Sequence, residues 1–307
     1  MSMTFKDVAD FYKRAPTPKG NSVKSANTCR IVDQLCKEFG DYPIQRFEKK
    51  DLVLTYLGKM RERKHRHTGE PISNGHINSY VTVLRAIIRF ARDELEVIDR
   101  VPKIQQLPEG KREFYFTPVQ MNELCRWLDP IRGAMVKFAC NTGMRNANVR
   151  LLRWDQVSED CKWISLSGIE TKNGKPNMIP LNKNAQRVLK EMQVHRDYME
   201  QSYPYLGELT HVFAKEHHTV TANGKPFSKT SLCNEQWRYA VERAGLPKGT
   251  CFHHCRHTFA SWHVMSGTNE TVLMALGGWT NERSMKRYAH LSQKAKEDAT
   301  KALDGYY

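Results

Sequence analysis

An arginine and a lysine in the middle of this 307-residue sequence stand where they could hold an anion. Arg145 follows Thr142-Gly143, a turn that should end one helix, and it should open the next. Free amide groups and the helix dipole favour anions at that position. Lys172 precedes Asn173-Gly174, a dipeptide typical of a two-residue β-turn, so we expect it at the tip of a hairpin, within reach of a bound molecule.

Four more side chains toward the C-terminus could bind an anion or transfer a proton. His253 and Arg256 are three residues apart and should share one face of a helix. Trp279 and Tyr288 follow, nine residues apart, and supply an indole N–H and a phenol. A histidine and an arginine at this spacing are usually only a surface pair, so the order and combination of all these segments form the informative signal.

The elements that must position these residues are mostly helical. Apolar residues from Ile77 to Leu95 recur at i, i+3, i+4 and i+7, which predicts a helix capped by Ser73 or Asn74. Shorter helical patterns surround residues 23–39 and 47–60. We therefore predict a helical domain over residues 1–107, a linker over 108–116 and a second domain over 117–307.

The second domain should combine helices with two short strands. Thr117 and Gln120 form a capping box around Pro118 at its start. Strands are predicted at 163–167 and 178–181, on either side of the Asn173-Gly174 turn. Helical patterns cover residues 119–128, 132–141, 183–198, 230–244, 254–264, 270–276 and, in the tail, 294–303. The predicted fold class is mainly α with a small antiparallel β-sheet (α+β).

The charge of the chain indicates a nucleic-acid partner. Lys and Arg total 48 against 33 Asp and Glu, a formal net charge of +15, and the excess is shared between residues 1–112 (+8) and 113–307 (+7). Eight scattered cysteines and the lack of a signal-peptide pattern favour a reducing cytoplasm. No apolar run reaches the ~18 residues of a membrane helix, so we expect no membrane span.

Over about residues 117–290 the motifs resemble the tyrosine recombinase, or phage integrase, family. Thr142-Gly-Met-Arg145 is similar to the first arginine motif of the family, and Thr171-Lys172 to its catalytic lysine. His253-x-x-Arg256 is similar to the box that holds a general acid/base histidine and the second arginine. The helical first domain is similar to the core-binding domain of the family.

The last two residues complete the resemblance. Trp279 stands where many members carry histidine and some carry tryptophan, and Tyr288 stands where the nucleophile belongs. The resemblance implies that Tyr288 attacks a DNA phosphodiester and forms a 3′-phosphotyrosine, with His253 taking its proton. The Trp279 indole N–H would hold a phosphate oxygen.

The other three residues would support this attack without any cofactor or metal ion. Arg145 and Arg256 would clamp the non-bridging oxygens, and Lys172 would protonate the departing 5′ oxygen. The implied enzyme is a site-specific recombinase that integrates and excises phage or prophage DNA in the bacterial cytoplasm or nucleoid. Its expected partners are double-stranded DNA, three further copies in a tetramer, and accessory DNA-bending proteins; the tail could dock on a neighbouring copy or in cis.

The sequence departs from the family pattern near two of these residues. Asn148 stands where the family usually has an acidic residue that buttresses the site, which leaves the orientation of Arg145 open. Lys175 is a second candidate for the lysine. We also expect no arm-binding domain of the kind that many phage integrases carry before the helical bundle.

Three other interpretations remain. A run of thiols and imidazoles at Cys251, His253, His254, Cys255 and His257 could hold zinc, but it lacks a second, separated ligand pair. The basic charge and the helices also suit a DNA-binding protein without catalysis.

A metal-dependent nuclease is the third. Glu170-Thr-Lys172, with Asp155 or Asp160, resembles the Glu-x-Lys end of such an enzyme. This interpretation leaves the two arginines and Tyr288 unexplained.

Overall fold

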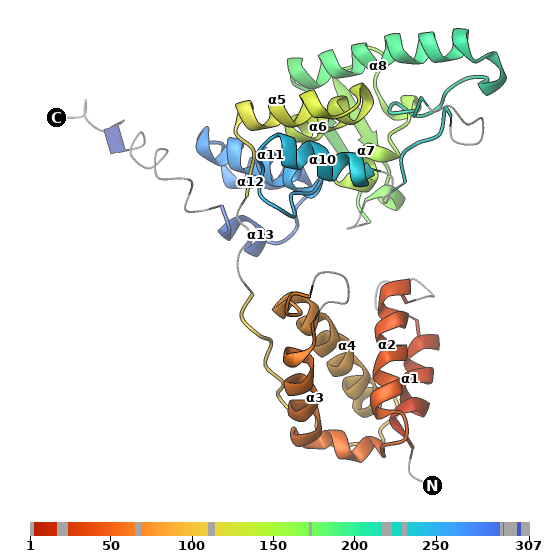
Figure 1. The fold of residues 1–307 in the computed structure, drawn as a ribbon, viewed down its shortest axis with the longest axis vertical. Helices are drawn as coiled ribbons and strands as arrows, with labels where there is room; N and C mark the ends of the chain where they lie inside the picture. Colours follow the sequence, from red (N-terminus) through yellow and green to blue (C-terminus); the bar gives the residue numbers. More distant parts are fainter. Residues whose placement is uncertain are drawn as a thin grey trace. The chain divides into compact units, whose positions relative to one another are not determined.

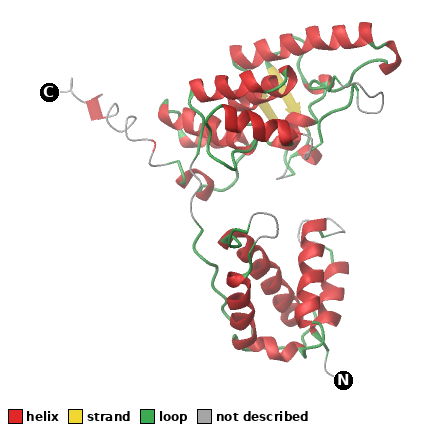
Figure 2. Ribbon diagram, in the orientation of Figure 1, coloured by secondary structure: helices red, strands yellow, loops and turns green. Residues whose placement is uncertain are grey.

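Two compact units, Met1–Lys111 and Arg112–Tyr307, make up the chain (Figure 1). The computed structural model describes residues 3–16, 24–64, 69–109, 114–171, 174–216, 223–228, 232–288, 291 and 300–301. Helices dominate both units and two short strands lie in the second (Figure 2), which confirms the predicted fold class. The predicted tail helix falls almost wholly outside the described residues.

In the described part of the first unit, four helices and a 3₁₀ turn enclose the core. They are α1 (Phe5–Arg14), α2 (Ala26–Phe39), η1 (Ile44–Glu48), α3 (Asp51–Glu62) and α4 (Asn74–Asp93). Ser73 caps α4 by accepting the backbone N–H of His76, as its position predicted. Helix α1 is an addition to the predicted elements; it begins at a capping box that Thr4 and Asp7 form.

The second unit is built around α11 (His253–Met265), which packs against α6 (Pro130–Thr142) and α12 (Glu270–Gly277). The other helices among the described residues of this unit are α5 (Pro118–Trp127), α7 (Asn146–Arg150), α8 (Lys183–Ser202), α10 (Glu235–Arg243) and α13 (Arg283–Lys286). Thr117 and Gln120 form the predicted capping box of α5. Thr258, in the middle of α11, fixes the chain before α5 because its hydroxyl accepts the backbone N–H of Phe116 at 2.9 Å.

The two strands pair as predicted, but the connection between them differs. Strands β1 (Trp163–Leu166) and β2 (Asn177–Pro180) are antiparallel, with Ile164 opposite Ile179. The described residues between them, 167–171 and 174–176, include a 3₁₀ turn, η3 (Gly168–Glu170), so both strands end well before the predicted Asn173-Gly174 turn, which includes an undescribed residue. The reason is local: Ser167 and Glu170 cap each other and end the first strand early. Lys172 and Asn173 lie outside the described residues.

A glycine in the left-handed conformation separates α6 from α7. Gly143 ends α6 with a φ of 63°, and Arg145 is the N-cap of α7, as the sequence predicted. A Cβ on Gly143 would lie 2.4 Å from Cδ1 of Phe259 on α11. Only a residue without a side chain allows the turn to approach α11 this closely.

The close approach at Gly143 can be tested against a glycine that has the same conformation in open space. Gly245 has a φ of 62°, and no atom of the described residues lies within 4 Å of the position that a Cβ would take there. Gly245→Ala should lower the free energy of unfolding by about 1–2 kcal/mol. Gly143→Ala should cost about 1–3 kcal/mol more, because Phe259 must also move. All 6 tryptophans lie after residue 112, so urea unfolding followed by tryptophan fluorescence reports on the second unit. Equal losses in the two variants would refute the role of the contact.

Candidate active site

Three segments that are distant in the sequence meet around two arginines. Arg256, in the first turns of α11, donates from Nη1 to the carbonyl of Gly143 at 2.5 Å. Arg145 donates from Nη2 to the carbonyl of Gly278, the C-cap of α12, at 3.1 Å. The α6–α7 junction, the start of α11 and the end of α12 therefore converge, and they place the two guanidinium groups in one site.

Arg256 is a buried cation with spare hydrogen-bonding capacity. The residue is 5% exposed, and its Nη2 has no hydrogen-bond partner among the described residues. Burial, and then the charge of Arg145, lower the pKa of Arg256 to about 9. A buried donor without an acceptor, next to a like charge, creates a strong preference for an anion at this position.

Trp279 covers Arg256 with the face of its indole ring. The guanidinium carbon lies 3.9 Å from the ring centroid, within the range of a cation–π interaction. A Cβ on Gly277 would overlap this ring at 1.7 Å, so the path of the chain before Trp279 requires glycine. The indole face holds the arginine in place, a contact that the sequence did not predict.

Tyr288 lies in a small apolar cluster beside this site. It is 6% exposed and is grouped with Phe259, Leu273 and Met285. Burial raises the pKa of the Tyr288 hydroxyl to about 12, although Arg287 and Arg256 oppose the change. The phenol therefore stays protonated at neutral pH, and it needs a proton acceptor before it can act as a nucleophile.

The histidine in contact with this phenol is His257. Its Nδ1 lies 2.5 Å from Oη of Tyr288. His253 is the first residue of α11; it is exposed, and its ring packs edge-on against that of His257 with centroids 4.9 Å apart. The sequence motifs gave His257 no role in the reaction, although it follows Arg256 directly and was also considered as a zinc ligand. Its position one helical turn after His253 was the available signal for a second histidine on the same face.

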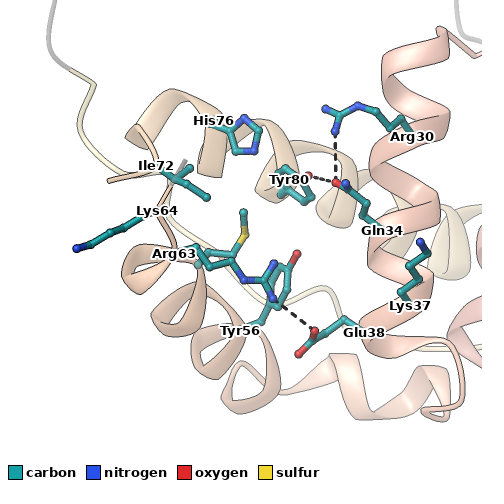
Figure 3. Close-up of a pocket in the computed structure, with 11 residues that line it drawn as sticks. Arg30, Gln34, Lys37, Glu38, Tyr56, Arg63, Lys64, Ile72, His76 and Tyr80 are labelled. Atoms are coloured by element: carbon teal, nitrogen blue, oxygen red, sulfur yellow. Dashed lines mark hydrogen bonds and ion pairs between the residues drawn. The ribbon is translucent and has the colours of Figure 1, made fainter. Parts of the chain in front are cut away.

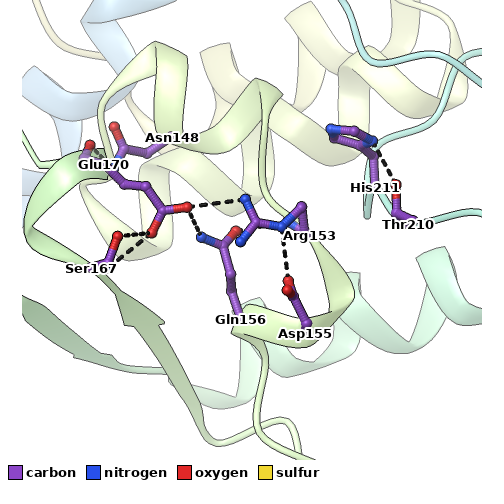
Figure 4. A network of polar contacts seen from close by, with 8 residues as sticks. All are labelled: Asn148, Arg153, Asp155, Gln156, Ser167, Glu170, Thr210 and His211. Atoms are coloured by element: carbon purple, nitrogen blue, oxygen red, sulfur yellow. Dashed lines mark hydrogen bonds and ion pairs between the residues drawn. The ribbon is translucent and has the colours of Figure 1, made fainter.

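A network of polar contacts holds the segment that leads to Lys172 (Figure 4). One carboxylate oxygen of Glu170 accepts from the backbone N–H and hydroxyl of Ser167 at 2.9 and 2.8 Å. The other accepts from Gln156 at 2.6 Å and Arg153 at 3.1 Å. Burial alone would raise the pKa of Glu170, but these hydrogen bonds from Ser167 and Arg153 outweigh it and leave the pKa below its ordinary value.

Asn148 belongs to the same network. Its Nδ2 donates to the backbone carbonyl of Glu170 at 3.3 Å, so it joins α7 to the segment before Lys172. Arg145 is oriented by the carbonyl of Gly278. The amide at position 148 thus supports the neighbouring segment through a neutral hydrogen bond.

The contacts also bear on the nuclease interpretation. Both carboxylate oxygens of Glu170 already accept hydrogen bonds, and Asp155 pairs with the same Arg153 at 3.0 Å. Asp160 pairs with Lys162 at 3.0 Å on the exposed surface. Glu170 and Asp155 therefore meet at a cation, Arg153, and Asp160 has a lysine partner of its own, so these carboxylates have partners other than a metal ion.

The zinc interpretation meets a similar difficulty. Cys255 is fully buried, and Nδ1 of His254 accepts the backbone N–H of Cys251 at 2.9 Å. Within the described residues no group of three His, Cys, Asp or Glu side chains has the arrangement to hold a metal ion.

The first unit contains a separate polar cavity of about 540 Å³ (Figure 3). Four of its lining residues are Lys or Arg and one, Glu38, is acidic. Gln34 accepts from Arg30 at 3.5 Å and from the hydroxyl of Tyr80. The basic lining residues are Arg30 and Lys37 of α2 and Arg63 and Lys64, which follow α3.

Comparisons with known proteins identify the family. The model of the phage integrase family matches residues 115–295. The integrase of Salmonella phage P22 is 28% identical over 312 aligned residues, covering 99% of this chain and 71% of that protein. The Tn1549 transposon integrase, solved in complex with a circular intermediate DNA, matches with a TM-score of 0.74 at 19% identity over 98% of this chain and 100% of that one. A lambda integrase dimer bound to a COC′ core site matches at 0.67 and 15%, over 93% and 95%.

The chain belongs to the phage integrase family, and it is a tyrosine-type site-specific DNA recombinase. The resemblance that its motifs indicated is therefore confirmed. No helix within the described ranges is both long and apolar enough to cross a membrane.

The Glu170 network predicts a contrast between two carboxylates that contact the same arginine. Glu170→Ala leaves Ser167, Gln156 and Arg153 without their acceptor and should cost about 2–3 kcal/mol of unfolding free energy. Asp155→Ala removes an exposed pair and should cost less than about 1 kcal/mol. Both are measured by urea unfolding with tryptophan fluorescence at pH 7.5.

The same pair has a predicted pH dependence. The lowered pKa of Glu170 means that its stabilisation is complete above the unfolded pKa of about 4.3 and disappears as the pH falls through the lower folded value. The gap between wild type and Glu170→Ala should therefore narrow below about pH 4. A gap that is unchanged at low pH, or a larger loss for Asp155→Ala, would show that the network does not act in this way.

Proposed function

We propose that this recombinase integrates and excises phage or prophage DNA by cleaving and rejoining strands through a 3′-phosphotyrosine at Tyr288. The observation that carries the proposal is the Nη2 of buried Arg256, which is unsatisfied among the described residues and lies beside Arg145 and the Tyr288 phenol. A phosphodiester supplies what this arrangement lacks, an anionic acceptor with two free oxygens. The chemistry follows from that fit.

Arg145 and Arg256 bind the non-bridging oxygens of the scissile phosphate. Their fixed guanidinium groups stabilise the charge that develops as phosphorus becomes five-coordinate. Because Gly143 and Gly278 hold these groups through backbone carbonyls, little reorganisation is needed when the phosphate arrives. Two such donors make the phosphorus electrophilic enough for a phenol to attack.

The remaining proposed residues handle protons and position the phosphate. Lys172 protonates the departing 5′ oxygen, and His253, exposed at the start of α11, faces incoming DNA as an acid/base group. The Trp279 indole N–H binds a phosphate oxygen while its ring face positions Arg256. The phosphotyrosine conserves the energy of the broken bond, so a 5′ hydroxyl of a partner strand can reverse the step.

The first unit contributes DNA binding, as a domain of the core-binding type over about residues 1–107. The cavity lined by Arg30, Lys37, Arg63 and Lys64 offers four cations against Glu38 and fits a strand of phosphates. We propose that the active assembly is a tetramer on double-stranded DNA and that accessory DNA-bending proteins assist it. It would act in the bacterial cytoplasm or nucleoid.

The nucleophile is tested by trapping covalent protein–DNA adducts. Wild type is incubated in EDTA with a supercoiled plasmid library that carries random inserts, and adducts are precipitated with detergent and sequenced. Wild type should form adducts enriched in one sequence, and Tyr288→Phe should form none. Tyr239→Phe, which alters an exposed tyrosine of α10, is the control and should behave as wild type. Adducts with Tyr288→Phe, or cleavage that requires added Mg²⁺, would contradict the proposal.

The cavity of the first unit is tested by the salt dependence of DNA binding. Lys37→Ala in the full chain should weaken binding to a random-sequence duplex and reduce the slope of log K against log[salt] by about 1. The matched control is Arg92→Ala, an exposed cation of the same unit that pairs with Asp93 outside the cavity. Equal effects of both variants, measured by fluorescence anisotropy, would remove the cavity from the DNA interface.

A further inference from the structure

We infer that His257 is the base that accepts the Tyr288 proton as the phenol attacks the scissile phosphate. This assignment rests on the proposed function and deepens it, because the histidine of the family resemblance is His253. His257 contacts the reacting oxygen itself, at 2.5 Å from Nδ1 to Oη. In the described residues, no contact of this kind joins His253 to Tyr288.

The proposed proton transfer assigns a direction to this hydrogen bond. The phenol donates, Nδ1 of a neutral His257 accepts, and Nε2 carries the ring proton; the 2.5 Å contact accommodates this tautomer. An imidazole in this tautomer presents a lone pair to the phenolic hydrogen. The arrangement is the ground state of a proton transfer from Oη to Nδ1.

The groups that face His257 keep it neutral until DNA binds. They are His253 and His254 on its own helix, Arg256, Arg287 and the uncharged phenol of Tyr288. Burial first, and then these positive or chargeable neighbours, lower the pKa of His257 to about 4, whereas that of Tyr288 is raised to about 12. The proton therefore stays on the phenol in the free enzyme.

A bound phosphodiester changes this balance. Its negative charge offsets Arg145 and Arg256, and it favours the charged imidazolium at position 257. The phenol oxygen becomes more acidic as its bond to phosphorus forms. Proton transfer is thus coupled to the arrival of the substrate, and the idle enzyme does not expose a phenolate.

The step balances with the groups already named. The bond from Oη to phosphorus forms while the bond from phosphorus to the 5′ oxygen breaks. The phenolic proton moves to Nδ1 of His257, and the 5′ oxygen takes a proton from Lys172. In the reverse reaction His257 returns its proton to Oη, and neither direction needs another reactant.

The first test examines the pair without DNA. In protein with ¹⁵N-labelled histidines, Tyr288→Phe should shift the Nδ1 resonance of His257, because the hydrogen bond is lost. His263 lies on the same helix, and its Nδ1 is bonded to Thr268 Oγ1 at 2.9 Å, so its resonance should not move. An unchanged His257 resonance would overturn the inference whether or not the protein recombines DNA.

The second test measures the proton transfer. The probe is a duplex recovered from wild-type adducts, made with either a normal or a 5′-bridging phosphorothiolate scissile link. His257→Asn keeps a hydrogen-bond acceptor but not a base, and it should slow adduct formation by about 10²–10⁴-fold at pH 7. The deficit should shrink toward pH 10, where the phenol ionises more readily. The sulfur leaving group should rescue Lys172→Ala but not His257→Asn.

Controls separate the possible outcomes. His263→Asn should react as wild type, and His257→Gln provides a second variant if His257→Asn does not fold. A His257→Asn rate within about threefold of wild type, a deficit that does not change with pH, or rescue by the phosphorothiolate would each overturn the inference. Absence of adducts with wild type would instead refute the proposed function. The ¹⁵N resonance of His257 would still test its hydrogen bond with Tyr288.

Discussion

The second unit is organised around a buried guanidinium that needs an anion. Arg256 donates a hydrogen bond from Nη1 to the Gly143 carbonyl, and the Trp279 ring covers its guanidinium group. Its Nη2 has no acceptor in the described part of the chain. Placing a cation there, close to Arg145, costs free energy that the folded chain alone does not recover. The packing of α11 on α6 and α12 offsets this cost and keeps the guanidinium buried. In the proposed function, a bound phosphate would supply the acceptor that Nη2 lacks among the described residues.

Burial also disfavours the charged form of Tyr288, but here the charged form is an anion. Burial in an apolar cluster suppresses ionisation of the phenol, while the positive charges of Arg287 and Arg256 favour it. In the proposed reaction, a phosphate bound by Arg145 and Arg256 would change this balance. The phenol would then lose its proton only when the substrate is present.

Local signals in the sequence predicted local features well. Capping by Ser73 and Thr117 and the glycine turn before Arg145 depend on neighbouring residues only, and the structure has each of them. The end of the first strand at Leu166 was not predicted, because it depends on the cap that Ser167 and Glu170 form, and a dipeptide rule at Asn173-Gly174 does not include that cap. The proposed site residues were found through motif order rather than through geometry.

Contacts between residues far apart in the sequence could not be predicted from the sequence. Arg145 is held by the Gly278 carbonyl, 133 residues away, and Tyr288 meets His257 across 31. Nothing in either neighbourhood specifies its distant partner. Such pairings arise from tertiary packing, which the helical periodicity of α11 constrains only to one face.

The overlap between Gly277 and the Trp279 ring restricts the order in which this site can evolve. A side chain at position 277 cannot coexist with the indole, since its Cβ would fall 1.7 Å from the ring. A smaller ring at position 279 removes this overlap, so position 277 accepts alanine more readily once the ring has been reduced. Either change also alters the cover of Arg256, so the effects of substitutions at the two positions depend on each other.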